Sequence, residues 1–158
     1  MALRLLVVDG YTRPARQELV AGGATIAADQ YVNMFMDLYP GNIQCDVVFP
    51  SDPDSALPQG ADLAAYDGIA WTGCSLTIYE CTAEVGRQID FARAAFIAGV
   101  PSFGSCWAAQ IAVVAAGGAC RANPRGREMG IARKITLTPE GRAHQMYEGK
   151  PSVFDAFI

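Results

Sequence analysis

Short apolar runs alternate with amphipathic stretches along most of the chain. Four runs have the length and continuous apolar character of buried parallel strands: Leu3–Val8, Cys45–Phe49, Ile69–Thr72 and Val100–Phe103. Three stretches have helical spacing or length: Ala24–Tyr39, Thr82–Gly99 and Trp107–Ala116. Two later runs, Ile131–Leu137 and Val153–Ile158, are also expected to form strands. Residues 11–23 are polar, and Ser51–Gly60 is expected to be an exposed loop.

This order of strands and helices predicts a three-layer α/β fold. The central sheet should be mainly parallel with helices on both faces, as in flavodoxin-like folds. Ligands bind such sheets outside the carboxyl ends of the strands. No repeat or linker interrupts the chain, so residues 1–158 are expected to form a single domain.

Composition and charge narrow the function classes. With 51% hydrophobic residues and 18% charged residues, the chain lies outside the range typical of disorder, and its net charge of -4 disfavours nucleic acid as a partner. No run approaches the roughly 18 apolar residues that span a bilayer, so no membrane association and a cytoplasmic location are expected. No dinucleotide or Walker motif and no cluster of metal ligands is present, so no cofactor or metal is expected.

The turn Gly104-Ser105-Cys106 carries the most specific chemical signal. An expected strand leads directly into an expected helix, with a cysteine at the corner and small residues beside it, as in a nucleophile elbow. Free N–H groups at the start of the helix favour a thiolate there and can bind an oxyanion. The same pattern is compatible with a small cysteine packed in a core turn.

The other four cysteines carry weaker signals. Cys45 and Cys120 are expected to be packing residues, whereas Cys74 and Cys81 flank a polar loop and could be accessible. An odd number of widely spaced cysteines is typical of a reducing compartment rather than of a disulfide framework.

The segment around the cysteine resembles a family signature. Gly104-Ser105-Cys106-Trp107-Ala108-Ala109-Gln110 is similar to the Gly-x-Cys-x-Gly-x-Gln motif of class I glutamine amidotransferases, the type that forms the glutaminase domain of GMP synthase. Ala108 replaces the second glycine. Asp67–Ser75 is similar to the strand and oxyanion loop of that family, with Cys74-Ser75 in place of a glycine and a proline, and Glu128-Met129-Gly130 is similar to its Glu-x-Gly motif.

The resemblance implies an enzyme that hydrolyses the side-chain amide of glutamine or a related γ-glutamyl amide. Cys106 would be the nucleophile, forming a γ-glutamyl thioester and releasing ammonia. The backbone N–H groups of Gly73 and Trp107 would form the oxyanion hole, and Gln110 and Gly104 would bind the substrate. A synthetase that receives the ammonia is the partner that the resemblance suggests.

The resemblance also implies a general base on a His-x-Glu segment, which this sequence lacks. Its one histidine, His144, matches neither catalytic position and is expected on the surface. We therefore expect the chain to represent a domain truncated at its C-terminal end, with little turnover by itself. A sheet edge left open in this way favours association with a second copy or with another chain.

Two alternatives remain open at the level of sequence. One is a γ-glutamyl peptide hydrolase built on a related elbow. The other is a non-catalytic module of the same fold that senses oxidants through Cys106, because a reactive thiol without a base suits redox sensing.

Overall fold

The computed structural model describes residues 2–126 and 128–157, which form two compact units. The first unit covers residues 1–121 and the second residues 122–158, and each is described separately below. The expectation of a single domain stays a prediction. Within the described residues, no helix combines the length and the apolar character needed to cross a bilayer.

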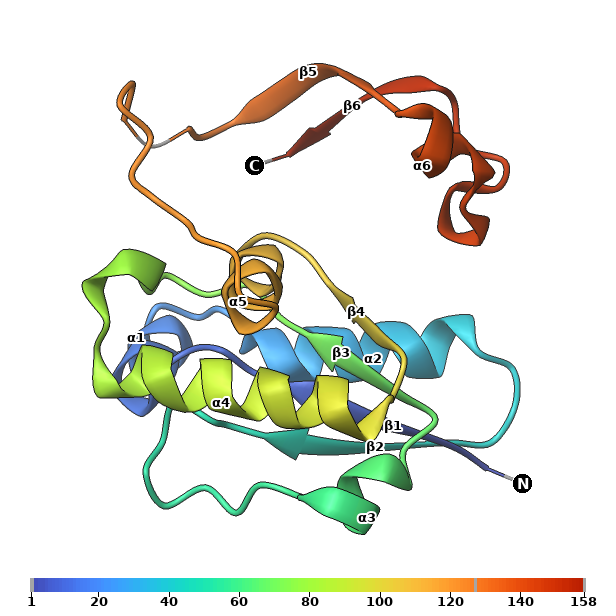
Figure 1. Ribbon diagram of the computed structural model, residues 1–158. Helices are drawn as coiled ribbons and strands as arrows, with labels where there is room; N and C mark the ends of the chain where they lie inside the picture. Colours follow the sequence, from blue (N-terminus) through green and yellow to red (C-terminus); the bar gives the residue numbers. More distant parts are fainter. Residues whose placement is uncertain (1, 127, 158) are drawn as a thin grey trace. The chain divides into compact units, whose positions relative to one another are not determined.

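The first unit is built on a four-stranded parallel sheet with the order β2-β1-β3-β4 (Figure 1). The strands are β1 (Leu3–Val8), β2 (Ile43–Val48), β3 (Gly68–Trp71) and β4 (Ser102–Gly104). Pairing aligns Val8 with Val48 and Trp71, and Trp71 in turn with Gly104. All four strands therefore finish at the same edge of the sheet.

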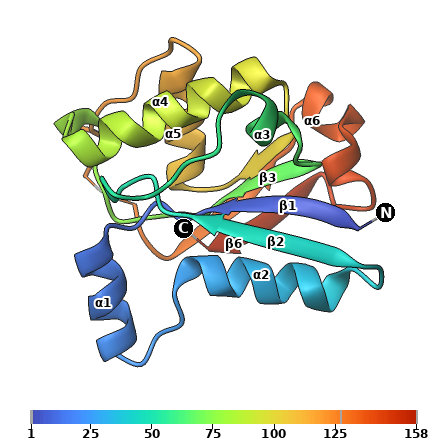
Figure 2. The same ribbon diagram turned by 90° about the horizontal axis from the view of Figure 1, so that it is seen from below.

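Helices cover both faces of this sheet, which confirms the expected three-layer architecture. They are α1 (Arg13–Ala21), α2 (Ala27–Leu38), α3 (Gly60–Ala64), α4 (Ala83–Ala98) and α5 (Trp107–Ala115), with a short 3₁₀ turn η1 (Ile78–Glu80) before α4. Figure 2 shows α2 on one face and α3, α4 and α5 on the other. The core between the sheet and these three helices includes Leu6, Leu63, Ile69, Val85 and Ile111.

The α4 helix begins and ends where the sequence predicts. The Thr82 side chain accepts a hydrogen bond from the Val85 N–H at the start of the helix, and Gly99 ends it in the left-handed conformation with φ 70°. The observed bounds of β1 are those expected, and the bounds of β2, β3 and β4 differ from the expected ones by one or two residues.

Three features of the first unit differ from the expectation. The polar stretch contains α1, which starts at a Thr12 cap and buries none of its residues. The α2 helix begins at Ala27 instead of Ala24, because the Asp9 carboxylate accepts the Ala28 N–H there. The expectation that Ser51–Gly60 is exposed was wrong at its start, since Ser51 and Asp52 are buried.

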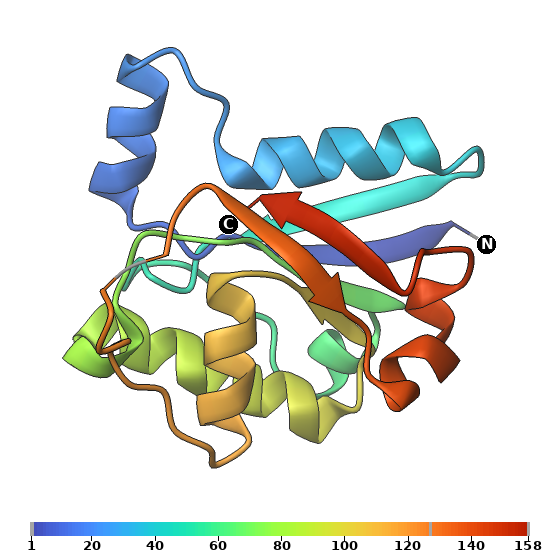
Figure 3. The ribbon, with the colours of Figure 1, turned by 90° about the horizontal axis from the view of Figure 1, so that it is seen from above.

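The second unit contains an antiparallel pair of strands, β5 (Ile131–Thr136) and β6 (Val153–Phe157) (Figure 3). Between them lie the short helix α6 (Pro139–Ala143) and the 3₁₀ turn η2 (Gln145–Tyr147). A bulge interrupts the pairing where Lys134 has φ 57° and donates its N–H to Asp155. His144 is exposed, as expected, and its Nδ1 accepts the Met146 N–H.

The buried Asp52 carboxylate attaches α1 to the rest of the first unit. It lies 2.6 Å from the Arg16 guanidinium, accepts the Arg13 N–H and is 7% exposed, while Arg16 also lies over the Phe49 ring at 4.0 Å. We expect Asp52→Ala to lower the free energy of unfolding by about 2–4 kcal/mol, because it leaves the Arg16 guanidinium, whose side chain is 11% exposed, without its carboxylate. Urea unfolding followed by circular dichroism would measure this change.

The matched control is Asp54→Ala, because Asp54 also pairs with an arginine, at 2.6 Å from Arg13, but is 64% exposed. Its removal should cost less than about 1 kcal/mol. Equal costs for the two variants would show that burial of Asp52 is not what makes its ion pair important.

Candidate functional site

The candidate site is assembled from three chain segments that leave the same edge of the sheet. Because Val8, Trp71 and Gly104 are aligned across β1, β3 and β4, the residues that follow them are neighbours in space. These are Asp9-Gly10, Thr72-Gly73 and Ser105-Cys106. The arrangement agrees with the rule that parallel sheets bind ligands at their carboxyl ends.

Cys106 occupies a strained and exposed corner. It is the residue before α5 and has φ 57° and ψ -114°, a backbone conformation that is uncommon for a residue with a side chain. The side chain is exposed, whereas the next residue, Trp107, is 2% exposed. An exposed thiol on a sharp strand-to-helix turn is the geometry of a nucleophile elbow and not of a buried packing cysteine.

Gly73 lies directly beside this thiol. A Cβ built on Gly73 would be 3.6 Å from the Cβ and 3.8 Å from the Sγ of Cys106. Trp107 is the first residue of α5, so its N–H has no partner within the helix. The structure thus brings the expected nucleophile next to one expected oxyanion-hole residue, while the other follows the nucleophile in the chain.

Gly104 and Ala108 share a space that holds one methyl group. A Cβ built on Gly104 would lie 2.4 Å from the Ala108 Cβ and 3.1 Å from the Trp71 Cβ. Ala108 is 6% exposed and belongs to the core. The methyl group that departs from the family signature therefore packs against Gly104, and the expected role of Gly104 in substrate binding stays a prediction.

Gln110 lies one helical turn after Cys106 and is exposed. Residues four apart share a helix face, so this position is compatible with the expected contact to substrate. The expected role of Gln110 in substrate binding stays a prediction.

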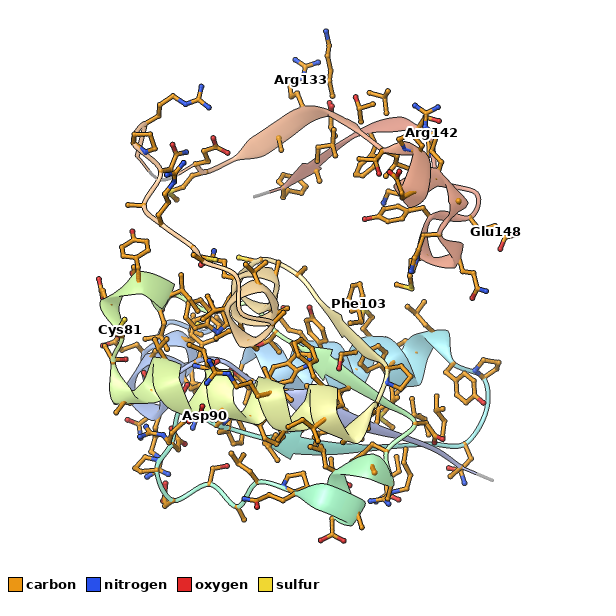
Figure 4. All side chains as sticks on the ribbon, in the orientation of Figure 1. Cys81, Asp90, Phe103, Arg133, Arg142 and Glu148 are labelled. Atoms are coloured by element: carbon orange, nitrogen blue, oxygen red, sulfur yellow. The ribbon has the colours of Figure 1, made fainter. Side chains whose placement is uncertain are left out.

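The Cys74 side chain points into the core beside the site. Its Cβ lies 3.1 Å from the position of a Cβ on Gly10, and its Sγ accepts the Leu76 N–H at 3.3 Å. Burial is the main cause that raises the pKa of the Cys74 thiol to about 12; Asp9 and Cys106 contribute to this rise, and the hydrogen bond from the Leu76 N–H opposes it. Cys74 is therefore a neutral packing residue at neutral pH. By contrast, Cys81 is exposed in the turn before α4 (Figure 4).

A carboxylate that sequence reasoning treated only as a turn signal is completely buried at the end of β1. Asp9 is 0% exposed, and its two oxygens accept the N–H groups of Tyr11 and Ala28. Burial raises the pKa of Asp9 above its ordinary value of 3.8, although the two hydrogen bonds and Arg16 oppose this effect. With an oxygen bonded to each of these N–H groups, Asp9 joins β1 to α2.

We define the elbow as Gly104–Trp107. A set of buried polar groups, which the sequence did not indicate, lies beside it. The Trp107 indole N–H donates to the Gln88 Oε1 at 2.8 Å, and the Gln88 Nε2 donates to the Gly10 carbonyl at 3.1 Å and to the Ser51 Oγ at 2.8 Å. The Gly10 N–H donates to the Thr72 Oγ1 at 3.1 Å, and this hydroxyl donates to the Gly73 carbonyl at 2.9 Å. These bonds connect the start of α5 with the end of β3.

The described part of the chain contains no candidate metal site. Across residues 2–126 and 128–157, no group of three or more His, Cys, Asp or Glu side chains is placed to hold a metal ion. The five cysteines are all free.

Comparison with known proteins gives one clear relative in sequence. The chain is 37% identical over 158 residues to a γ-glutamyl-L-1-hydroxyisopropylamide hydrolase from a Pseudomonas species. The alignment covers 98% of this chain but 52% of the relative, so the chain spans about half the length of the curated relative it matches. Profiles of known protein families give no match.

Two solved structures share the fold. A putative GMP synthase component from Thermoplasma acidophilum superposes with a TM-score of 0.64 at 18% identity, covering 99% of this chain and 64% of that protein. The glutaminase domain of CTPS from Trypanosoma brucei, solved with bound acivicin, gives a TM-score of 0.60 at 16% identity, covering 99% of this chain and 66% of that one. These neighbours confirm the expected α/β fold.

The shared space between Gly104 and Ala108 predicts a coupled pair of substitutions. Gly104→Ala should lower the free energy of unfolding by about 2–3 kcal/mol, because its methyl group would overlap that of Ala108. Adding Ala108→Gly should recover part of this loss, although Ala108→Gly alone should destabilise α5 by about 1 kcal/mol. Thermal unfolding of the three variants would measure the coupling, and strictly additive costs would contradict it.

The burial of Cys74 predicts slow alkylation. With a pKa of about 12, only about one Cys74 in ten thousand is a thiolate at pH 8, and the rate should rise about tenfold per pH unit up to that pKa. Iodoacetamide labelling followed by peptide mass mapping would compare Cys74 with the exposed Cys81 in the same sample. Labelling of Cys74 as fast as Cys81 in the folded protein would contradict the burial.

Proposed function

We propose that this chain forms the nucleophile-bearing part of an enzyme that cleaves γ-glutamyl amides, with glutamine as the leading substrate. The Cys106 thiolate attacks the γ-carbonyl carbon, and a tetrahedral intermediate forms with its negative charge on the former carbonyl oxygen. Collapse of the intermediate releases ammonia and leaves a γ-glutamyl thioester, which water then hydrolyses to glutamate. The observation that carries this proposal is the exposed Cys106, held at φ 57° at the start of α5 with Gly73 beside it.

Backbone geometry supports Gly73 as an oxyanion donor. The Thr72 N–H donates to the Val8 carbonyl on the β1 side, while the Ile69 N–H donates to the Pro101 carbonyl on the β4 side. Successive residues of an extended chain direct their N–H groups to opposite sides. Gly73 lies two residues beyond the end of β3 at Trp71, and continuation of this alternation would direct its N–H to the side of Ile69, toward β4 and the elbow, where the Trp107 N–H begins α5. Two backbone donors aimed at one oxygen are the usual form of an oxyanion hole.

Proton transfer needs groups beyond those at the elbow. The leaving amine must gain a proton, and the water that hydrolyses the thioester must lose one. Asp9 is buried with both oxygens engaged, and the one histidine of the chain, His144, belongs to the second unit. We therefore expect acylation of Cys106 to be easier to detect in this chain than repeated turnover.

A second candidate substrate is a γ-glutamyl amide that carries an alkyl group on its nitrogen. It is favoured by the 37% identity to a relative named as a hydrolase of such an amide. Both candidates present the same γ-glutamyl carbonyl to Cys106, and they differ only in the amine that leaves. A synthetase that receives ammonia, self-association, a cytoplasmic location and an oxidant-sensing role of Cys106 stay predictions.

The proposal predicts that the γ-glutamyl electrophile 6-diazo-5-oxo-norleucine labels Cys106. Intact mass measurement should show one adduct per chain, and saturating glutamine should slow its formation at least tenfold by occupying the pocket. Protection by a γ-glutamyl alkylamide at lower concentration than by glutamine would identify the alkylamide as the substrate.

The control variants are Cys106→Ala, which should give no adduct, and Cys81→Ala, which removes another exposed thiol and should react like the wild type. An adduct that survives in Cys106→Ala would contradict the proposal. So would labelling of Cys106 that neither glutamine nor the alkylamide slows.

A further inference from the structure

The two expected oxyanion donors belong to different chain segments, and one continuous set of hydrogen bonds joins them. It runs from the Trp107 indole through the Gln88 amide to the Gly10 carbonyl, and from the Gly10 N–H through the Thr72 hydroxyl to the Gly73 carbonyl. Every step is between 2.8 and 3.1 Å. We call these five residues the buried relay.

The buried relay is shielded from water from Trp107 to Thr72, and its last member, Gly73, is half-buried. Gln88 and Thr72 are each 1% exposed, Trp107 is 2% exposed and Gly10 is buried. Hydrogen bonds in such surroundings are stronger than in water and hold their geometry closely. A glutamine in the middle of a core-facing helix would be costly without partners, and Gln88 has three.

Close packing leaves the relay little freedom. A Cβ built on Gly10 would lie 2.9 Å from the Trp107 Cδ1 and 3.1 Å from both the Cys74 Cβ and the Gln88 Oε1. Ser51 strengthens the centre, because its hydroxyl donates to the Gly10 carbonyl at 2.8 Å while accepting from Gln88. Movement of α5 relative to β3 would therefore break bonds that have no water to replace them.

We propose that Gln88 and Thr72 are positioning residues that fix the spacing between the N–H groups of Trp107 and Gly73. The inference rests on the proposed function, since it assigns these two N–H groups to one oxyanion. Neither Gln88 nor Thr72 touches the substrate. Their effect is exerted on the stabilisation of the tetrahedral intermediate, and not on the thiol or on the binding of the γ-glutamyl group.

The rate of acyl transfer to Cys106 distinguishes a positioning role of Gln88 and Thr72 from a purely structural role. We expect Gln88→Met and Thr72→Val to slow the release of p-nitroaniline from γ-glutamyl-p-nitroanilide about 10–100-fold in single-turnover reactions, because a displaced oxyanion donor costs up to about 10²–10³ in rate. The dissociation constant for glutamine, read from its protection of Cys106, should change less than about threefold. Alkylation of Cys106 by iodoacetamide, which forms no oxyanion, should keep the wild-type rate.

Two matched variants complete the comparison. Thr72→Ser keeps the hydroxyl and should restore most of the acylation rate. Val85→Ala, on the same helix as Gln88 and also 1% exposed, lies outside the relay and should lower the Tm without slowing acylation. If Val85→Ala slows acylation as much as Gln88→Met at equal loss of Tm, the role of Gln88 is only structural and the inference is overturned.

An NMR measurement decides the inference without any reaction. In ¹H–¹⁵N spectra of the full chain, Thr72→Val should shift the Trp107 indole signal and Gln88→Met should shift the Gly73 amide signal, while Val85→Ala leaves both in place. Failure of both cross-effects overturns the inference even if the wild type acylates. Inertness of the wild type toward γ-glutamyl compounds defeats the proposed function, and the spectra then decide separately whether the relay couples the two N–H groups.

Discussion

The in-register pairing of β1, β3 and β4 is the constraint on which the whole candidate site depends. The pairing aligns Val8, Trp71 and Gly104 on one line across the sheet. Without this register, the residues that follow the three strands would not lie beside one another. A shift of one residue in any of these pairs would move a segment by more than about 3 Å and turn its side chains to the other face of the sheet. The buried faces on both sides of the sheet oppose such a shift, so the hydrophobic core sets the geometry of the polar edge.

Polar groups just beneath the elbow are buried at a cost that their hydrogen bonds offset. Within the described residues, no buried side-chain nitrogen or oxygen lacks a partner. This completeness matters because an unpaired amide or hydroxyl in such surroundings costs roughly 1–3 kcal/mol, as much as a well-packed side chain contributes. The Gln88 amide and the Thr72 and Ser51 hydroxyls thus connect chain segments. Hydrogen bonds fix the relative orientation of these segments more closely than apolar packing does. The same region buries Asp9 completely and Cys74 in part, while the Cys106 side chain is exposed at this edge.

Sequence periodicity predicted those parts of the fold whose causes are local. The four parallel strands, α4 with its Thr82 and Gly99 caps, and the elbow with Cys106 at its corner follow from apolar runs, capping residues and small residues at a turn. The start of α2 could not be predicted, because it depends on Asp9, which is distant in the chain. The α1 helix buries none of its residues and was missed, although Thr12 at its cap and Pro14 in its first turn are local signals of a helix start. Gln88 looked like any polar residue on an amphipathic helix, and only its tertiary partners distinguish it from a surface glutamine.

The backbone of Cys106 has a thermodynamic consequence for how the residue is retained. Its positive φ is a conformation that glycine adopts freely and that costs other residues about 1–3 kcal/mol. A glycine at this position would relax the turn and make the chain more stable while removing its thiol. Selection for stability alone would therefore tend to discard the cysteine, and drift would meet no folding penalty in losing it. The cysteine at this position therefore carries a cost in stability that its exposed side chain does not recover by packing.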